Sequence, residues 1–129
     1  MKYLAKIIAG DLEGLRIISA CSSGAKVKVS GIKYLASNKV FLLSIERIKV
    51  ENEIEDKKVN SILRFDFVEK SRSKNINQSD QEAVLELVGI DYLKNNDVYE
   101  INLIFNNNAH IALTTETIEA RLEDQSETK

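Results

Sequence analysis

Apolar residues near the N-terminus recur at the spacing of a helix turn. The stripe consists of residues three apart: Leu12, Leu15, Ile18 and Cys21. Asp11 precedes the stripe as an N-cap, and Gly24 follows it where a helix often ends in a left-handed residue. The pattern predicts a helix over about 11–22. Cys21 on this stripe is most simply a small core residue.

From residue 25 onward, apolar residues recur at every second position, which is typical of strands. The alternation predicts strands at 25–29, 32–36, 40–50, 61–69, 83–93, 99–105 and 110–113. Ser30 and Gly31 interrupt it as a bulge or a tight turn, and the phase slips at Ile48, which predicts a second bulge. The charged segment 51–60 and the polar segment 70–82 predict two long loops.

The end of the chain has the features of a second helix. Thr114 or Thr115 can serve as its N-cap, and Ile118 and Leu122 lie four residues apart, as on one helix face. The sequence therefore predicts a C-terminal helix, followed by a disordered tail at 125–129.

These elements predict one α+β domain over residues 1–124. The architecture is a strongly bent antiparallel sheet or open barrel of six to seven strands, with an N-terminal and a C-terminal helix. The count matches a pleckstrin-homology-like barrel, an analogy of fold that implies no function. The predicted core residues are Val27, Phe41, Leu43, Ile45, Leu63, Phe65, Phe67, Leu85, Leu87, Ile101, Leu103, Phe105, Leu113, Ile118 and Leu122.

Composition narrows the class of protein. The 129 residues are 43% hydrophobic and 29% charged, as in folded globular domains. A single Cys and a single His exclude a disulfide framework and a zinc site of four Cys or His ligands from one chain. Lys6 interrupts the apolar N-terminus too early for a signal peptide, and no apolar run has the length of a membrane span. We therefore expect a cytoplasmic protein.

Several segments resemble a known family. They are Ser-Asp-Gln-Glu-Ala-Val-Leu-Glu-Leu at 79–87, Leu-Arg-Phe-Asp at 63–66, Ile-Ser-Ala at 18–20, Asn-Leu-Ile-Phe at 102–105, and the ending at 116–124. Together they are similar to a conserved alphaproteobacterial family known only as a domain of unknown function. The resemblance covers nearly the whole chain, and it implies no catalytic residue.

Basic residues are concentrated in the first half of the chain. Residues 1–50 hold nine Lys and Arg against three Asp and Glu, a net charge of +6, which leaves −8 for the rest of a chain whose total is −2. If 26–49 forms one hairpin of unbroken register, Lys26 lies opposite Lys49 and Lys28 opposite Arg47. Such a cluster would bind an anion. If Ser30 and Gly31 shift the register, these cations separate and pair with carboxylates, which is the outcome we favour.

Other chemistry is sparse. Lys70, Arg72 and Lys74 form a looser anion-binding candidate, while the absence of interleaved aromatic residues and the pI of 5.5 argue against nucleic acid. Cys21 and His110 are not expected to form a catalytic pair. No phosphate loop, dinucleotide motif or metal-ligand spacing is present, so no catalytic, cofactor or metal residue is assigned. We expect a non-catalytic binding or scaffold module for a protein, for a second copy of itself or for an anionic partner. The alternative is a small enzyme, or a subunit of one, with a carboxylate- or Lys-based site.

Overall fold

The computed structural model describes residues 5–49 and 57–127, which form one α-helix and ten strands. The helix is α1 (Leu12–Ser22), and two short 3-10 turns span Val29–Gly31 and Ala36–Asn38. The strands are β1 (Lys6–Ala9), β2 (Ala25–Lys28), β3 (Ile32–Leu35), β4 (Val40–Lys49), β5 (Lys57–Phe65), β6 (Val68–Lys74), β7 (Val84–Asn95), β8 (Val98–Phe105), β9 (His110–Thr115) and β10 (Ala120–Glu127).

The helix forms where the apolar stripe predicted it. The Asp11 carboxylate accepts a hydrogen bond from the Gly14 N–H at 2.8 Å, which caps the first turn. Gly24 has a φ of +85°, the left-handed conformation expected just beyond the helix end. Leu15 and Ile18 are fully buried against the sheet. The prediction of this helix and both of its ends is confirmed.

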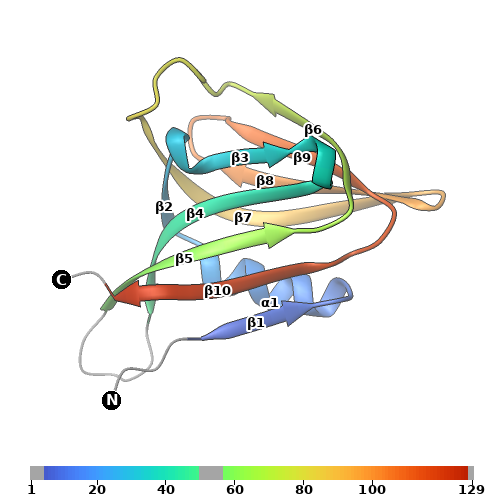
Figure 1. Ribbon diagram of the computed structural model, residues 1–129, viewed down its shortest axis with the longest axis horizontal. Coiled ribbons are helices and arrows are strands. Elements are labelled where there is room, and N and C mark those ends of the chain that lie inside the picture. Colours follow the sequence, from blue (N-terminus) through green and yellow to red (C-terminus); the bar gives the residue numbers. More distant parts are fainter. Residues whose placement is uncertain (1–4, 50–56, 128–129) are drawn as a thin grey trace.

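All the strands pair antiparallel in one sheet that does not close on itself (Figure 1). The order is β1-β10-β5-β4-β2-β7-β8-β9-β6, and β3 pairs with β4 beside β2. The sheet curls strongly, so that β3 and β6 face each other while α1 lies beneath the sheet next to β1. The fold is a mostly-β single domain, which confirms the strongly bent, open antiparallel sheet but with more strands than the six to seven expected.

The register of the first hairpins changes at the 3-10 turn Val29–Gly31. On one side of it, β3 pairs with β4 so that Ile32 lies opposite Leu43. On the other side, β2 meets β4 with Lys26 opposite Glu46 and not opposite Lys49. The turn shifts the register because its residues leave the ladder. The favoured interpretation of Ser30 and Gly31 is thus confirmed.

The C-terminal helix prediction was wrong, because the described residues at this end form strand β10. Ile118, Ala120 and Leu122 are all buried, and the residues between them are not. A spacing of four residues fits two strand periods as well as one helix turn, so it could not separate the two structures. Pairing with β1 and β5 then selects the strand. The tail expected at 125–129 begins inside β10, which extends to Glu127.

The prediction of one strand over 61–69 and a loop at 70–82 is only partly confirmed, because the first strand ends at Phe65 and a second strand occupies Val68–Lys74 before the loop begins. The chain turns at Phe67, whose φ of +59° takes it out of the extended conformation and leaves its side chain 51% exposed. Val68 takes the inward position instead and begins β6, whose polar sequence is held as a strand by pairing with β9. Similarly, β5 begins at Lys57, inside the loop expected at 51–60.

Strand β4 has no second bulge. Its register with β5 is continuous from Phe41 to Lys49, so Arg47 faces inward and Ile48 faces solvent with 52% of its surface exposed. The alternation of apolar residues appeared to shift at Ile48 because the preceding inward position is occupied by a charged residue, Arg47. Apart from Phe67 and the half-buried Leu85, every predicted core residue is buried.

Candidate functional site

The curled sheet leaves an open seam between β3 and β6. In the described residues β3 pairs only with β4, and β6 pairs only with β9. At one end of the seam the Val68 N–H donates to the Lys39 carbonyl, and the Tyr34 hydroxyl donates to the Val68 carbonyl, both at 2.8 Å. At the other end the Ser30 N–H donates to the Gln81 carbonyl at 3.1 Å. Between these ends, the described backbone makes no hydrogen bond from β3 to β6.

A cavity of about 300 Å³ lies in this seam, and we call it the β3–β6 slot. It is lined by Val29, Ile32, Tyr34, Phe41, Ser71, Ser73, Ile76, Gln78, Gln81 and Ile111. Phe41 and Ile111 are each only 1% exposed and belong to the hydrophobic core, so the slot reaches the interior of the domain. Its volume is at the small end of ligand sites, which span about 300–1,000 Å³.

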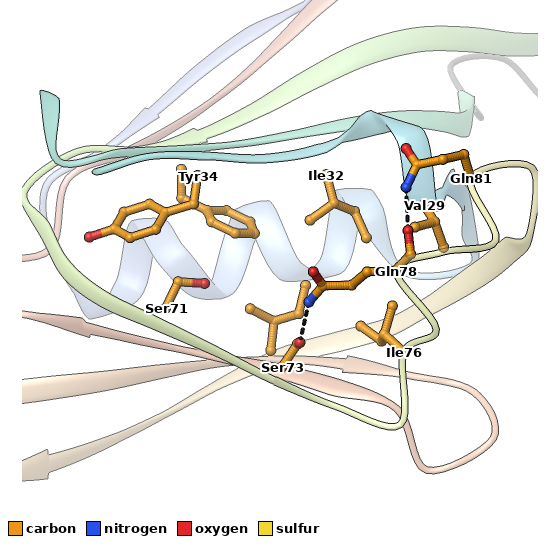
Figure 2. Close-up of a pocket in the computed structure, with 10 residues that line it drawn as sticks. Val29, Ile32, Tyr34, Ser71, Ser73, Ile76, Gln78 and Gln81 are labelled. Atoms are coloured by element: carbon orange, nitrogen blue, oxygen red, sulfur yellow. Dashed lines mark hydrogen bonds between the residues drawn. The ribbon is translucent and has the colours of Figure 1, made fainter. Parts of the chain in front are cut away.

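The two lips of the slot differ in polarity (Figure 2). Ile32 and Tyr34 come from β3 on one lip, while Ser71 and Ser73 come from β6 on the other. The loop that follows β6 closes one end of the slot. In this loop, the Gln78 side-chain amide donates to the Ser73 hydroxyl of β6 at 3.1 Å. The lining is therefore apolar with hydroxyl and amide groups, and none of its described residues has a formally charged side chain. Such a surface can bind apolar groups and form hydrogen bonds.

The looser of the two predicted anion-binding candidates borders this slot. Lys70, Arg72 and Lys74 alternate with the lining serines of β6 and are exposed on the outer face of the sheet. The Arg72 guanidinium forms an ion pair with Glu100 at 2.8 Å. The structure thus brings these cations together along one lip of the cavity, although the sequence predicted a loop here.

The structure does not bring together the cations of the anion-binding candidate predicted at the 26–49 hairpin. The Lys26 ammonium pairs with Glu86 at 3.0 Å, and that of Lys28 pairs with Glu82 at 3.4 Å. Both lysines border a wider hollow of about 550 Å³ on the outer face of the sheet. The side chain of Lys49 lies outside the described residues. Anion binding here stays a prediction, and the ion pairs argue against it because the lysines already have carboxylate partners.

Arg47, the fourth member of that candidate, is buried in an ion pair. Its Nε and Nη2 donate to the two Asp124 oxygens at 3.0 and 2.8 Å. The Ser61 hydroxyl and the Ala5 N–H also donate to this carboxylate, at 2.6 and 2.8 Å. Burial raises the pKa of Asp124, but the hydrogen bonds from Arg47, Ser61 and Ala5 and the charge of Arg47 outweigh it, so the pKa is lowered.

Sequence reasoning missed this pair, although β4 carried a signal for it. Phe41, Leu43 and Ile45 occupy successive inward positions, and the next inward position is Arg47. A charged residue in phase with the core implies a buried partner. Nothing in the sequence near Asp124 identified that partner, because the two residues lie on strands separated by β5.

The nucleophile and base candidates lie on opposite faces of the sheet. Cys21 is half-buried on α1 and packs against the core. His110 lies on the outer face of β9, opposite Ile104 and Lys74. They form no catalytic pair. Over 5–49 and 57–127, no group of three or more His, Cys, Asp or Glu residues could hold a metal ion.

Comparison with known proteins places the chain in a family without a known function. The sequence pattern described as "Protein of unknown function (DUF2948)" matches residues 5–129, so the chain belongs to this family. The match confirms the resemblance to a family of unknown function over nearly the whole chain. No curated protein and no solved structure matches. None of the helices in the described ranges has the length and apolar character that a membrane crossing requires.

Proposed function

We propose that this protein is a non-catalytic binding module that takes an extended segment of a partner protein into the β3–β6 slot. The observation that carries this proposal is the pair of strand edges that face each other across a cavity open to the core. Among the residues that the structure describes, β3 and β6 each pair on one side only.

Unpaired strand edges bind extended chains through their backbone. In an antiparallel pair, alternate residues direct their N–H and C=O groups away from the partner strand. Half of the residues of β3 and of β6 therefore direct these groups into the seam. A segment lying there would gain backbone hydrogen bonds from both sides, as in recognition by strand addition.

The size of the slot sets the length of this segment. Strand β3 has four residues, or roughly 13 Å at about 3.3 Å per residue. Both ends of the seam are closed by the hydrogen bonds of Val68 and Ser30, so the segment enters and leaves through the outer opening. About three or four residues of the partner fit between these ends.

The lining favours binding over the enzymatic alternative. A residue of the segment that points inward would contact Ile32, Phe41 and Ile111. Burial against these side chains favours an apolar residue. Ser71, Ser73 and the glutamine amides can satisfy a backbone or hydroxyl group. General acid–base catalysis calls for a titratable group near pH 7, and the lining supplies amides and hydroxyls in its place.

A phage-displayed library of random octapeptides tests the proposal. Ser73→Phe fills the slot from the β6 lip, whereas Ser79→Phe makes the same change at an exposed loop residue outside the lining. We expect selected peptides to bind the natural protein and Ser79→Phe but to lose at least tenfold in affinity for Ser73→Phe. Circular dichroism and thermal unfolding of both variants establish that they are folded. Failure to enrich any peptide, or equal binding to Ser73→Phe, would overturn the proposal.

A further inference from the structure

We infer that the partner segment alternates apolar and acidic residues, with its apolar side chains in the slot and its acidic side chains over the outer opening. This inference rests on the proposed function and specifies the chemistry of the partner. It is drawn from the cations on both lips of the slot and from the alternation that a strand in the seam must follow.

Lysines flank the opening from both strands. Lys33 lies between the two lining residues of β3, and Lys70 and Lys74 lie on either side of the lining serines of β6. Successive side chains of a strand point to opposite faces, so these lysines project outward where Ile32 and Ser71 point inward. All three lysines are exposed.

These lysines keep their charges available. In the part of the chain that the structure describes, none of Lys33, Lys70 and Lys74 has an ion pair or a side-chain hydrogen bond. The neighbouring carboxylates are already engaged, since Glu69 pairs with Lys39 at 3.0 Å and Glu100 pairs with the guanidinium of β6 at 2.8 Å.

A third strand between these two would continue the same pleat. Its inward side chains would lie beside Ile32 and Ser71, and its outward side chains beside Lys33 and Lys70. Opposite charges on adjacent strands stabilise a sheet, and like charges directly opposite destabilise it. Outward Asp or Glu is therefore favoured and outward Lys or Arg is rejected.

Exposed lysines on strand edges have a second known role, and the experiment must distinguish it from the binding of an acidic segment. Charged residues on exposed strand edges also prevent two copies of a protein from pairing edge to edge. Under that explanation alone, the lysines would repel a second copy and would not discriminate between an acidic and a neutral peptide.

Fluorescence anisotropy with three labelled peptides tests the inference. The first is Gly-Ser-Val-Glu-Val-Glu-Val-Gly-Ser, the second has Gln for Glu, and the third groups the same residues as Val-Val-Val-Glu-Glu. We expect the acidic alternating peptide to bind about tenfold more tightly than the Gln peptide at about 50 mM salt, because exposed ion pairs contribute a factor of about 1.4 to 5 each. The advantage should shrink at about 500 mM salt, where screening is stronger.

A charge-matched pair of variants identifies the lysines responsible. Replacing Lys33, Lys70 and Lys74 together with Gln should bring the acidic peptide down to the affinity of the Gln peptide. The control replaces Lys6, Arg16 and Lys94 with Gln, which removes the same charge at exposed residues outside the lining and should preserve the tenfold preference.

The outcomes separate this inference from the proposed function. If the acidic and Gln peptides bind equally and Ser73→Phe abolishes both, the inference fails and the proposed function stands. Equal binding of the grouped peptide would show attraction by net charge alone and would also overturn the inference. If none of the peptides binds, or if only a small amphiphile such as decanoate does, both fail.

Discussion

Replacing Asp124 with Asn tests whether the buried ion pair is essential for the fold. The substitution preserves the size of the side chain but removes its charge and replaces one acceptor oxygen with a donor. The carboxylate is 0% exposed, and both of its oxygens accept hydrogen bonds from Arg47. An amide group at this site would direct N–H toward the Arg47 guanidinium or the Ala5 N–H, donor against donor.

The expected loss of stability follows from burial. The Arg47 side chain is only 8% exposed, so without its partner it becomes a buried and uncompensated charge. Removing one member of a buried ion pair destabilises a protein by about 3–5 kcal/mol. Because domains of this size are stable by about 5–15 kcal/mol, Asp124→Asn should lower the urea midpoint substantially or prevent folding.

Urea unfolding followed by circular dichroism measures this loss. Glu86→Gln is the control, because it breaks the exposed pair with Lys26 and should cost less than about 1 kcal/mol. If Asp124→Asn fails to fold, the double variant Arg47→Met with Asp124→Leu preserves the test, since matched apolar replacements of buried pairs are often neutral or stabilising. The double variant should be more stable than the single one.

The pH dependence gives a second measurement of the same pair. The pKa of Asp124 lies below its ordinary value of 3.8, so the folded state holds the ionised form more firmly than the unfolded state does. Its contribution is therefore fully present above about pH 4 and is lost as the pH falls toward the folded pKa. The stability difference between the natural protein and Asp124→Asn should shrink in this acid range. A loss below about 1 kcal/mol at neutral pH, or a difference that grows in acid, would refute the reasoning.

Two further comparisons test packing. Gly14→Ala should destabilise the protein by about 1–3 kcal/mol in thermal unfolding, because the added Cβ would lie 2.8 Å from the Ala9 Cβ; this outweighs the better helix propensity of Ala. Gly10→Ala is the control and should have little effect in the same assay, because its added Cβ would meet no atom within 4 Å. Phe65→Ala should cost about 3–5 kcal/mol because Phe65 is fully buried, whereas Phe67→Ala should cost at most about 1.5 kcal/mol because half of its side chain is exposed. Equal effects within either pair would contradict the packing described.

Local sequence patterns were sufficient to predict an element where the spacing of its apolar residues fits only a helix or only a strand. The stripe from Leu12 to Cys21 and the cap at Asp11 admit only a helix, and the structure contains it. The alternation from Phe41 to Ile45 likewise admits only a strand with one buried face. Asn96 and Asn107 adopt positive φ in the turns between β7 and β8 and between β8 and β9, since Asn tolerates that conformation.

The sequence by itself determined the N-terminal helix, most of the strands and nearly all of the core, because these depend on hydrophobic period and capping within a few residues. Tertiary structure alone decided three features: β10 in place of a helix, Arg47 inside the core, and the β3–β6 slot. The spacing of Ile118 and Leu122 fits either element until β1 and β5 pair with the segment. Arg47 can be buried only because Asp124, distant in sequence, arrives beside it. The slot exists because the curl of the whole sheet brings two unpaired edges face to face, and no local pattern encodes that curl.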